Sequence, residues 1–192
     1  MRLQGGVIIL NETSTLVDVG GCRLYFSVIP GTEDIVILEA GGGADSSSWG
    51  SFPLQLAQET DATVVTYDRA GFGKSDSPTS PYNLVEEVDW LMTGLRKLGL
   101  AYDLILAGHS YGGWHIRMTA SRYPDVIRGM VLIDPFSTAF VNLLGVDYLD
   151  VHPMAAKDPP FDTSNPDALT KNQRGLIRRV KDGLGPKVQV MR

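Results

Sequence analysis

The sequence holds one cysteine, Cys22, three histidines and no long hydrophobic run. A single cysteine excludes an intrachain disulfide and a zinc site built from several cysteines. The apolar run at residues 7–10 is too short for the core of a secretory signal, and no run approaches the length of a membrane span. We therefore expect a cytoplasmic protein with no membrane span.

Positive charge is scarce as well, since 17 lysines and arginines stand against 22 aspartates and glutamates, for a net charge of −5. A nucleic-acid surface needs a basic patch or stripe, and none is present. The one dense cationic stretch, at residues 174–181, has the spacing of the solvated face of a helix. These features argue against a nucleic-acid partner, and no pattern implies a cofactor or a metal ion.

Short apolar runs alternate with helical patterns along much of the chain. The clearest helix spans residues 83–98, where apolar side chains recur at spacings of three and four. Asn83 can cap its start and Gly99 can end it. This alternation needs crossover connections, so it predicts one domain with a mainly parallel sheet. The expected core strands are Ile35–Leu38, Thr63–Tyr67, Leu104–Ala107 and Met130–Ile133.

The most informative motif is Gly-His-Ser-Tyr-Gly at residues 108–112. It follows an expected strand and precedes a helical pattern over residues 113–123, so Ser110 lies at a sharp strand-to-helix turn. Gly-x-Ser-x-Gly in this setting is typical of a nucleophile elbow, which exposes the serine hydroxyl above the sheet. The N–H of Tyr111 then lies at a helix N-terminus, where it can stabilise an oxyanion.

Polar or glycine residues follow each of the other expected strands. Ligands of open α/β sheets bind at the carboxyl ends of the strands. Gly42, Asp68 and Asp134 fall at such ends, as Ser110 does. We therefore expect the chemistry of the protein to gather at this edge.

The order of these strands and loops resembles that of the α/β-hydrolase family, from about Leu16 to Pro135. The glycine-rich turn at residues 41–43 resembles the family's oxyanion loop, although Ala40 stands where a histidine is common, and residues 67–75 resemble a second family hallmark. The resemblance implies an α/β fold with a doubly wound, mainly parallel sheet and a partial helical cap. It places the hydrolase core at 1–135, a cap-like insertion at 136–186 and the start of a further core strand at 187–192.

The same resemblance implies a serine hydrolase acting on a small ester- or amide-like substrate, with a carboxylic ester hydrolase as the first expectation. Ser110 would be the nucleophile, and the N–H groups of Gly42 and Tyr111 would form the oxyanion hole. Asp134, or an acid after the strand near Val190, would orient the base. Asp68 and Arg69 are expected to fix a loop, whereas Glu39 takes a position that is usually apolar and the sequence offers no reason for it.

The base of this machinery has no obvious candidate, because a serine needs a histidine within hydrogen-bond reach. His109 lies in the elbow and is expected to point away from Ser110, His115 is expected to pack, and His152 falls in the cap-like segment. Three explanations stay open. Either the histidine lies beyond Arg192, or a second chain or self-association supplies it and covers the exposed sheet edge, or the protein is a non-catalytic ligand-binding or scaffold derivative.

Overall fold

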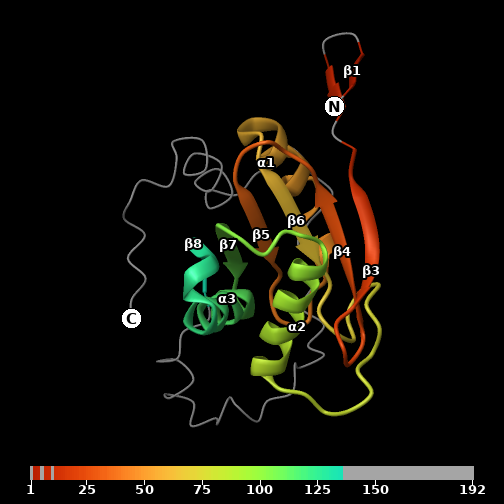
Figure 1. Cartoon of the computed structure of the whole chain (residues 1–192), viewed down its shortest axis with the longest axis vertical. Coiled ribbons are helices and arrows are strands. Elements are labelled where there is room, and N and C mark those ends of the chain that lie inside the picture. The colour runs from red at the N-terminus through yellow and green to blue at the C-terminus, as the bar shows by residue number, and fades with distance from the viewer. Residues whose placement is uncertain (1, 5–6, 10, 136–192) are drawn as a thin grey trace.

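The computed structural model of the chain describes residues 2–4, 7–9 and 11–135 (Figure 1). The predicted cap at 136–186, the predicted strand at 187–192 and His152 lie outside these residues. The boundaries proposed for the domains therefore stay predictions.

A six-stranded sheet forms the centre of the described part, in the order β3-β4-β6-β5-β7-β8. Strands β6, β5, β7 and β8 run parallel, while β3 and β4 are antiparallel to their neighbours. A separate two-stranded hairpin, β1 with β2, precedes the sheet. The strands are β1 (Arg2–Gln4), β2 (Val7–Ile9), β3 (Thr13–Asp18), β4 (Arg23–Ile29), β5 (Ile35–Glu39), β6 (Thr63–Tyr67), β7 (Leu104–His109) and β8 (Ile127–Ile133).

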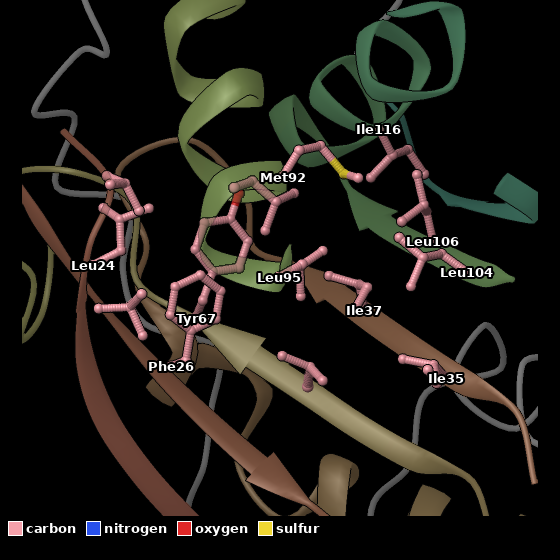
Figure 2. Close-up of a cluster of buried hydrophobic side chains, with 14 of the residues drawn as sticks. Leu24, Phe26, Ile35, Ile37, Tyr67, Met92, Leu95, Leu104, Leu106 and Ile116 are labelled. Atoms are coloured by element: carbon pink, nitrogen blue, oxygen red, sulfur yellow. The ribbon is translucent and has the colours of Figure 1, made fainter. Parts of the chain in front are cut away.

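Helices cover both faces of this sheet, as a doubly wound fold requires (Figure 1). Side chains of α2 and α3 pack with one face, in the cluster that Figure 2 shows, where Met92, Leu95 and Ile116 meet strand residues such as Ile37 and Leu106. Residues of α1 pack with the opposite face in a second cluster. The helical elements are η1 (Ser46–Trp49), α1 (Phe52–Thr60), α2 (Leu84–Lys97), α3 (Tyr111–Arg122) and η2 (Pro124–Val126).

Local sequence signals explain where α2 begins and why the region before β6 is divided. Asn83 accepts hydrogen bonds from the N–H groups of Val85 and Glu86, and the Glu86 carboxylate accepts one from the Asn83 N–H, which is a capping box. Residues 46–60 form two elements, η1 and α1, because Gly50 turns the chain with φ 54° before α1, which has Pro53 in its first turn. The α/β, mainly parallel fold expected from the sequence is confirmed.

Candidate active site

Ser110 joins β7 to α3 through a strained turn. Its φ is 51° and its ψ is −117°, a conformation that a residue with a side chain seldom adopts. The N–H of Ser110 donates to the carbonyl of Ile133 at 3.1 Å, and the Ser110 carbonyl accepts from Gly113 at 2.9 Å. The sharp strand-to-helix turn that the motif predicts is therefore present, with the serine half-buried at its tip.

The two glycines that flank Ser110 are required by close backbone packing. A Cβ on Gly108 would lie 2.3 Å from the carbonyl oxygen of Gly112, across the turn. A Cβ on Gly112 would lie 2.5 Å from the carbonyl oxygen of Glu39, at the end of β5. Both gaps are too short for a real carbon, so the absence of these side chains lets α3 pack against β5 and β7.

The glycine-rich turn after β5 lies beside the elbow. A Cβ on Gly41 would be 3.7 Å from Cβ of Ser110, and a Cβ on Gly42 would be 3.4 Å from Cβ of Tyr111. The Tyr111 N–H is the first of α3, so no carbonyl within that helix accepts it. The structure thus brings together the three residues that the sequence predicts for the nucleophile and the oxyanion donors, while their roles stay predictions.

Asp134 follows β8 at the same edge of the sheet. Strand pairing sets His109 opposite Ile133, which places Asp134 one residue beyond the strand end that faces the elbow. Asp134 is exposed, with a positive φ of 43°. The hydrogen bonds of Ser110 within the described residues join its backbone to Ile133 and Gly113, and none of them involves Asp134. Asp134 therefore lies at the expected edge of the sheet, but no contact within the described residues tests its predicted role as the acid.

The two histidines within the described ranges differ in surroundings. His115 is fully buried, with its ring 3.5 Å from the Tyr67 hydroxyl and 3.3 Å from the Glu39 carboxylate. Burial lowers the pKa of His115 to about 4, although the nearby carboxylate of Glu87 raises it. His115 is thus neutral near pH 7 and packed inside the fold, as the sequence predicts. His109 is half-buried, and its Nδ1 would lie 2.9 Å from a Cβ on Gly41.

Beneath the glycine-rich turn lies a buried ion pair that the sequence did not predict. Glu39 and Arg69 have side chains 1% and 2% exposed, and their charged groups approach to 2.5 Å. Glu39 also accepts a hydrogen bond from the Tyr67 hydroxyl. Burial raises the pKa of Glu39, and Arg69 and Tyr67 offset part of this effect. A carboxylate is therefore paired at the end of an otherwise apolar strand.

Arg69 spans three carbonyls of the turn. Its Nη1 donates to the carbonyl of Ala40 at 2.8 Å, and its Nη2 donates to those of Gly41 at 2.5 Å and Ala44 at 3.3 Å. Burial opposes its charge, but the carboxylates of Glu39 and Glu87 outweigh that effect and raise the pKa of Arg69. The guanidinium is therefore charged near neutral pH.

Asp68 fixes the same loops through partners of its own. Its carboxylate accepts from the N–H of Ser46 and from the N–H of Lys74, each at 2.8 Å. The sequence predicts that Asp68 and Arg69 fix a loop as a pair; both residues fix loops, but they do not pair with each other. Each uses separate partners, since the ion pair of Arg69 is with Glu39.

Tyr111 is held from its ring end as well as by the helix. Its hydroxyl donates to the Glu87 carboxylate at 2.7 Å, and its ring lies 5.1 Å from the guanidinium carbon of Arg69. Burial, and then the charge of Glu87, raise the pKa of Tyr111. The phenol is therefore a hydrogen-bond donor and not an ionised group, and the elbow residue is tied to α2 and to Arg69.

The part of the chain that the structure describes lacks two other classes of feature. None of its helices has both the length and the apolarity to cross a membrane. Nor do its histidine, cysteine, aspartate and glutamate side chains form a group of three that could hold a metal ion.

A strained serine between two crowded glycines, at the carboxyl edge of a mainly parallel sheet, defines the architecture of an α/β hydrolase core. The model of the Alpha/beta hydrolase family matches residues 35–188, which is most of the chain. The chain therefore belongs to the alpha/beta hydrolase family.

Several proteins with different names are similar in sequence to this chain. Uncharacterized protein YqjL of Bacillus subtilis (strain 168) is 30% identical over 118 residues, which cover 61% of this chain and 46% of that protein. A 2-(acetamidomethylene)succinate hydrolase of Mesorhizobium japonicum is 31% identical over 108 residues, covering 56% of this chain and 38% of the relative. This chain spans less than half the length of these two relatives.

A solved structure agrees with the fold. A thermophilic esterase from Thermogutta terrifontis superposes with a TM-score of 0.56 and 28% identity, covering 65% of this chain and 46% of the esterase. The family and the fold are thus shown, and hydrolases are found among the similar proteins.

Proposed function

We propose that this protein is a serine hydrolase that cleaves an ester- or amide-like bond in a small substrate, with Ser110 as the nucleophile. The observation that carries the proposal is the strained φ of 51° at Ser110, between two glycines that backbone atoms crowd. Strain at a single residue costs free energy, and it is found where the geometry serves a function. The names of the similar hydrolase and esterase support the same class of reaction.

In this proposal the Ser110 Oγ attacks the carbonyl carbon of the substrate and passes its proton to a histidine. The negative charge that develops on the carbonyl oxygen is stabilised by the N–H groups of Gly42 and Tyr111. Asp134 orients the base. The base itself is assigned to no histidine among residues 2–135, because His115 is buried and neutral inside the fold and His109 forms part of the elbow.

The proposal includes a small-molecule substrate, a cytoplasmic location and no nucleic-acid partner. It needs no metal ion or cofactor for the acyl transfer, since the serine, its base and the oxyanion donors suffice for this reaction. A second chain or a second copy that packs on β8, the last strand of the described part of the sheet, is the proposed source of the base if this sequence does not contain it.

A fluorophosphonate probe tests the proposal, because it modifies only a serine that a base has activated. We expect labelling of Ser110, located by mass spectrometry, in protein isolated from the cells that make it. The control is Ser110→Ala, which removes the Oγ and should abolish labelling. A native protein that binds small ligands but never reacts would establish the alternative, a non-catalytic derivative of the fold.

A further inference from the structure

We propose that Arg69 is a positioning residue, which holds the turn that carries the Gly42 N–H against the elbow that carries Ser110. Glu39 in turn holds Arg69 in place. The catalytic meaning of this inference rests on the proposed function, whereas its geometric content rests on the contacts of Arg69 alone.

The first step concerns a single peptide group. Arg69 Nη2 donates to the carbonyl of Gly41, and this carbonyl shares its peptide plane with the N–H of Gly42. A trans peptide is planar, with its N–H opposite to its C=O. By binding one end of this plane, Arg69 fixes the direction in which the Gly42 N–H points, which is away from the guanidinium. A cation on the carbonyl also polarises the peptide and strengthens the N–H as a donor.

The second step concerns the opposite donor. The guanidinium of Arg69 also contacts the ring of Tyr111, whose N–H is the other proposed oxyanion donor, and the ring of Phe72 at 5.4 Å. Both N–H groups must reach one oxygen atom, which tolerates an error of only about 0.5 Å. One rigid side chain in contact with both loops sets their separation.

The third step explains Glu39. A guanidinium buried without a carboxylate would be strongly unfavourable. Glu39 supplies that charge from the end of β5, directly before the turn, and it orients Nη1 toward the carbonyl of Ala40. The planar guanidinium offers five donors in a fixed arrangement, whereas the ammonium of a lysine could not span Glu39 and three carbonyls. The unusual glutamate and the arginine therefore act as one unit.

Asp68 provides an internal comparison for the test. The Ala44 N–H donates to the Gly41 carbonyl at 3.3 Å, inside the part of the turn that Arg69 holds. The Ser46 N–H donates to Asp68 instead, at 2.8 Å. Hydrogen exchange at these two amides separates loss of the turn from general loosening of the protein.

The experiment measures both amides in the native protein, in Arg69→Lys and in Glu39→Gln, with Arg128→Lys as the matched control. In Arg69→Lys we expect the exchange rate of the Ala44 amide to rise at least about tenfold, because the turn loses about one hydrogen bond of stabilisation. The exchange rates of the Ser46 amide and of the amides of β5 should change little. Glu39→Gln should shift in the same direction to a smaller extent, and Arg128→Lys should change neither amide.

Labelling kinetics supply a readout that a merely structural role would not move. In Arg69→Lys the rate constant of Ser110 modification should fall about 100-fold, as it does when an oxyanion donor is lost, while the apparent binding constant of the probe stays the same. Added guanidinium ion should restore part of the rate in Arg69→Ala.

Equal exchange changes at Ala44 and Ser46, or an unchanged labelling rate in Arg69→Lys, would overturn the inference. If Arg69→Lys does not fold, Glu39→Gln decides in the same way, and unfolding of both would show a general structural role and also overturn it. If the native protein never labels, the proposed function fails, and the exchange comparison still decides whether Arg69 positions the turn.

Discussion

Two arginines bind opposite ends of the neighbouring strands β5 and β7. Arg128 joins residues that precede these strands, at their amino ends, whereas Arg69 contacts residues that follow them, at their carboxyl ends. Arg128 pairs with Asp34 before β5 and with Asp103 before β7. Arg69 pairs with Glu39 at the end of β5 and binds three carbonyls of the following turn. The side chain of Arg128 is 33% exposed, that of Arg69 only 2%.

This difference in exposure indicates that the two arginine–carboxylate pairs have different roles. Water partly screens the pairs of Arg128, so they contribute less than a buried pair would lose on removal of one partner. The pair beneath the turn has been removed from water, and its net contribution to stability is small or unfavourable relative to apolar residues. A buried pair kept at the functional edge is therefore better explained by the geometry that it imposes than by stability.

Removing one member of each pair should give the largest contrast. Arg69→Met leaves Glu39 buried and unpaired, and should lower the free energy of unfolding by about 3–5 kcal/mol. Arg128→Met removes two partly exposed pairs, with Asp34 and Asp103, and should cost about 1 kcal/mol. Urea unfolding of the two variants measures the difference. Equal costs would show that the two edges do not differ in the way that their exposure indicates.

A double substitution sharpens this comparison. Glu39→Leu with Arg69→Met replaces both charges by apolar side chains, and should recover much of the stability that Arg69→Met alone loses. The reactivity of Ser110 should stay low, because the carbonyls of the turn have lost their donor. Labelling at the native rate in this stable variant would contradict a positioning role.

Alanine substitutions of two glycines compare how tightly the backbone is packed at the carboxyl and amino edges of the sheet. Gly108→Ala at the carboxyl edge places a carbon 2.3 Å from a carbonyl oxygen and should cost about 3 kcal/mol. Gly99 lies in the loop before β7, and a Cβ there would have no atom within 4 Å. Gly99→Ala should therefore lower the free energy of unfolding only through its φ of +73°, by about 1 kcal/mol. Thermal unfolding ranks the two variants. A larger loss in Gly99→Ala would mean that the elbow relaxes more easily than its packing indicates.

The buried His115 below the carboxyl edge should make the protein sensitive to acid. Its pKa is about 4 in the folded protein against an ordinary 6.5, so between these values the unfolded chain binds a proton that the folded protein does not. The stabilising contribution is complete above pH 6.5 and is lost as the pH falls toward 4. Between pH 7 and pH 5 the loss should be about 2 kcal/mol.

Comparison with His115→Gln isolates this contribution. The carboxylates, Glu39 included, are present in both proteins, so their titration largely cancels in the difference. Unfolding free energies measured at pH 7, 6 and 5 should fall more steeply for the native protein. Parallel curves would show that His115 is protonated in the folded protein or lies in contact with water.

The sequence predicts elements whose causes are local. The helix α2 begins at its capping box, and β6 has the expected bounds, because side chains within a few residues decide them. The elbow is predicted for the same reason, since glycine, serine and glycine lie within five residues. Apolar spacing over residues 46–60 does not reveal the turn at Gly50 that divides them into η1 and α1.

The buried pair could not be predicted in full because its members are 30 residues apart in the chain. They meet only when β5 and β6 pair in the register that sets Leu38 beside Thr66. A partial signal did exist, since a glutamate that ends an all-apolar strand needs a buried partner. The sequence does not reveal that this partner is Arg69, nor that the same arginine binds the glycine-rich turn.

The reaction of the native protein with a fluorophosphonate, read as intact mass and then as the modified peptide, tests the central claim most directly. The account predicts one added phosphonyl group on Ser110, absent from Ser110→Ala and slowed in Arg69→Lys. A native protein that stays unmodified, or one modified at another serine, would contradict the claim that the carboxyl edge of this sheet is an acyl-transfer site.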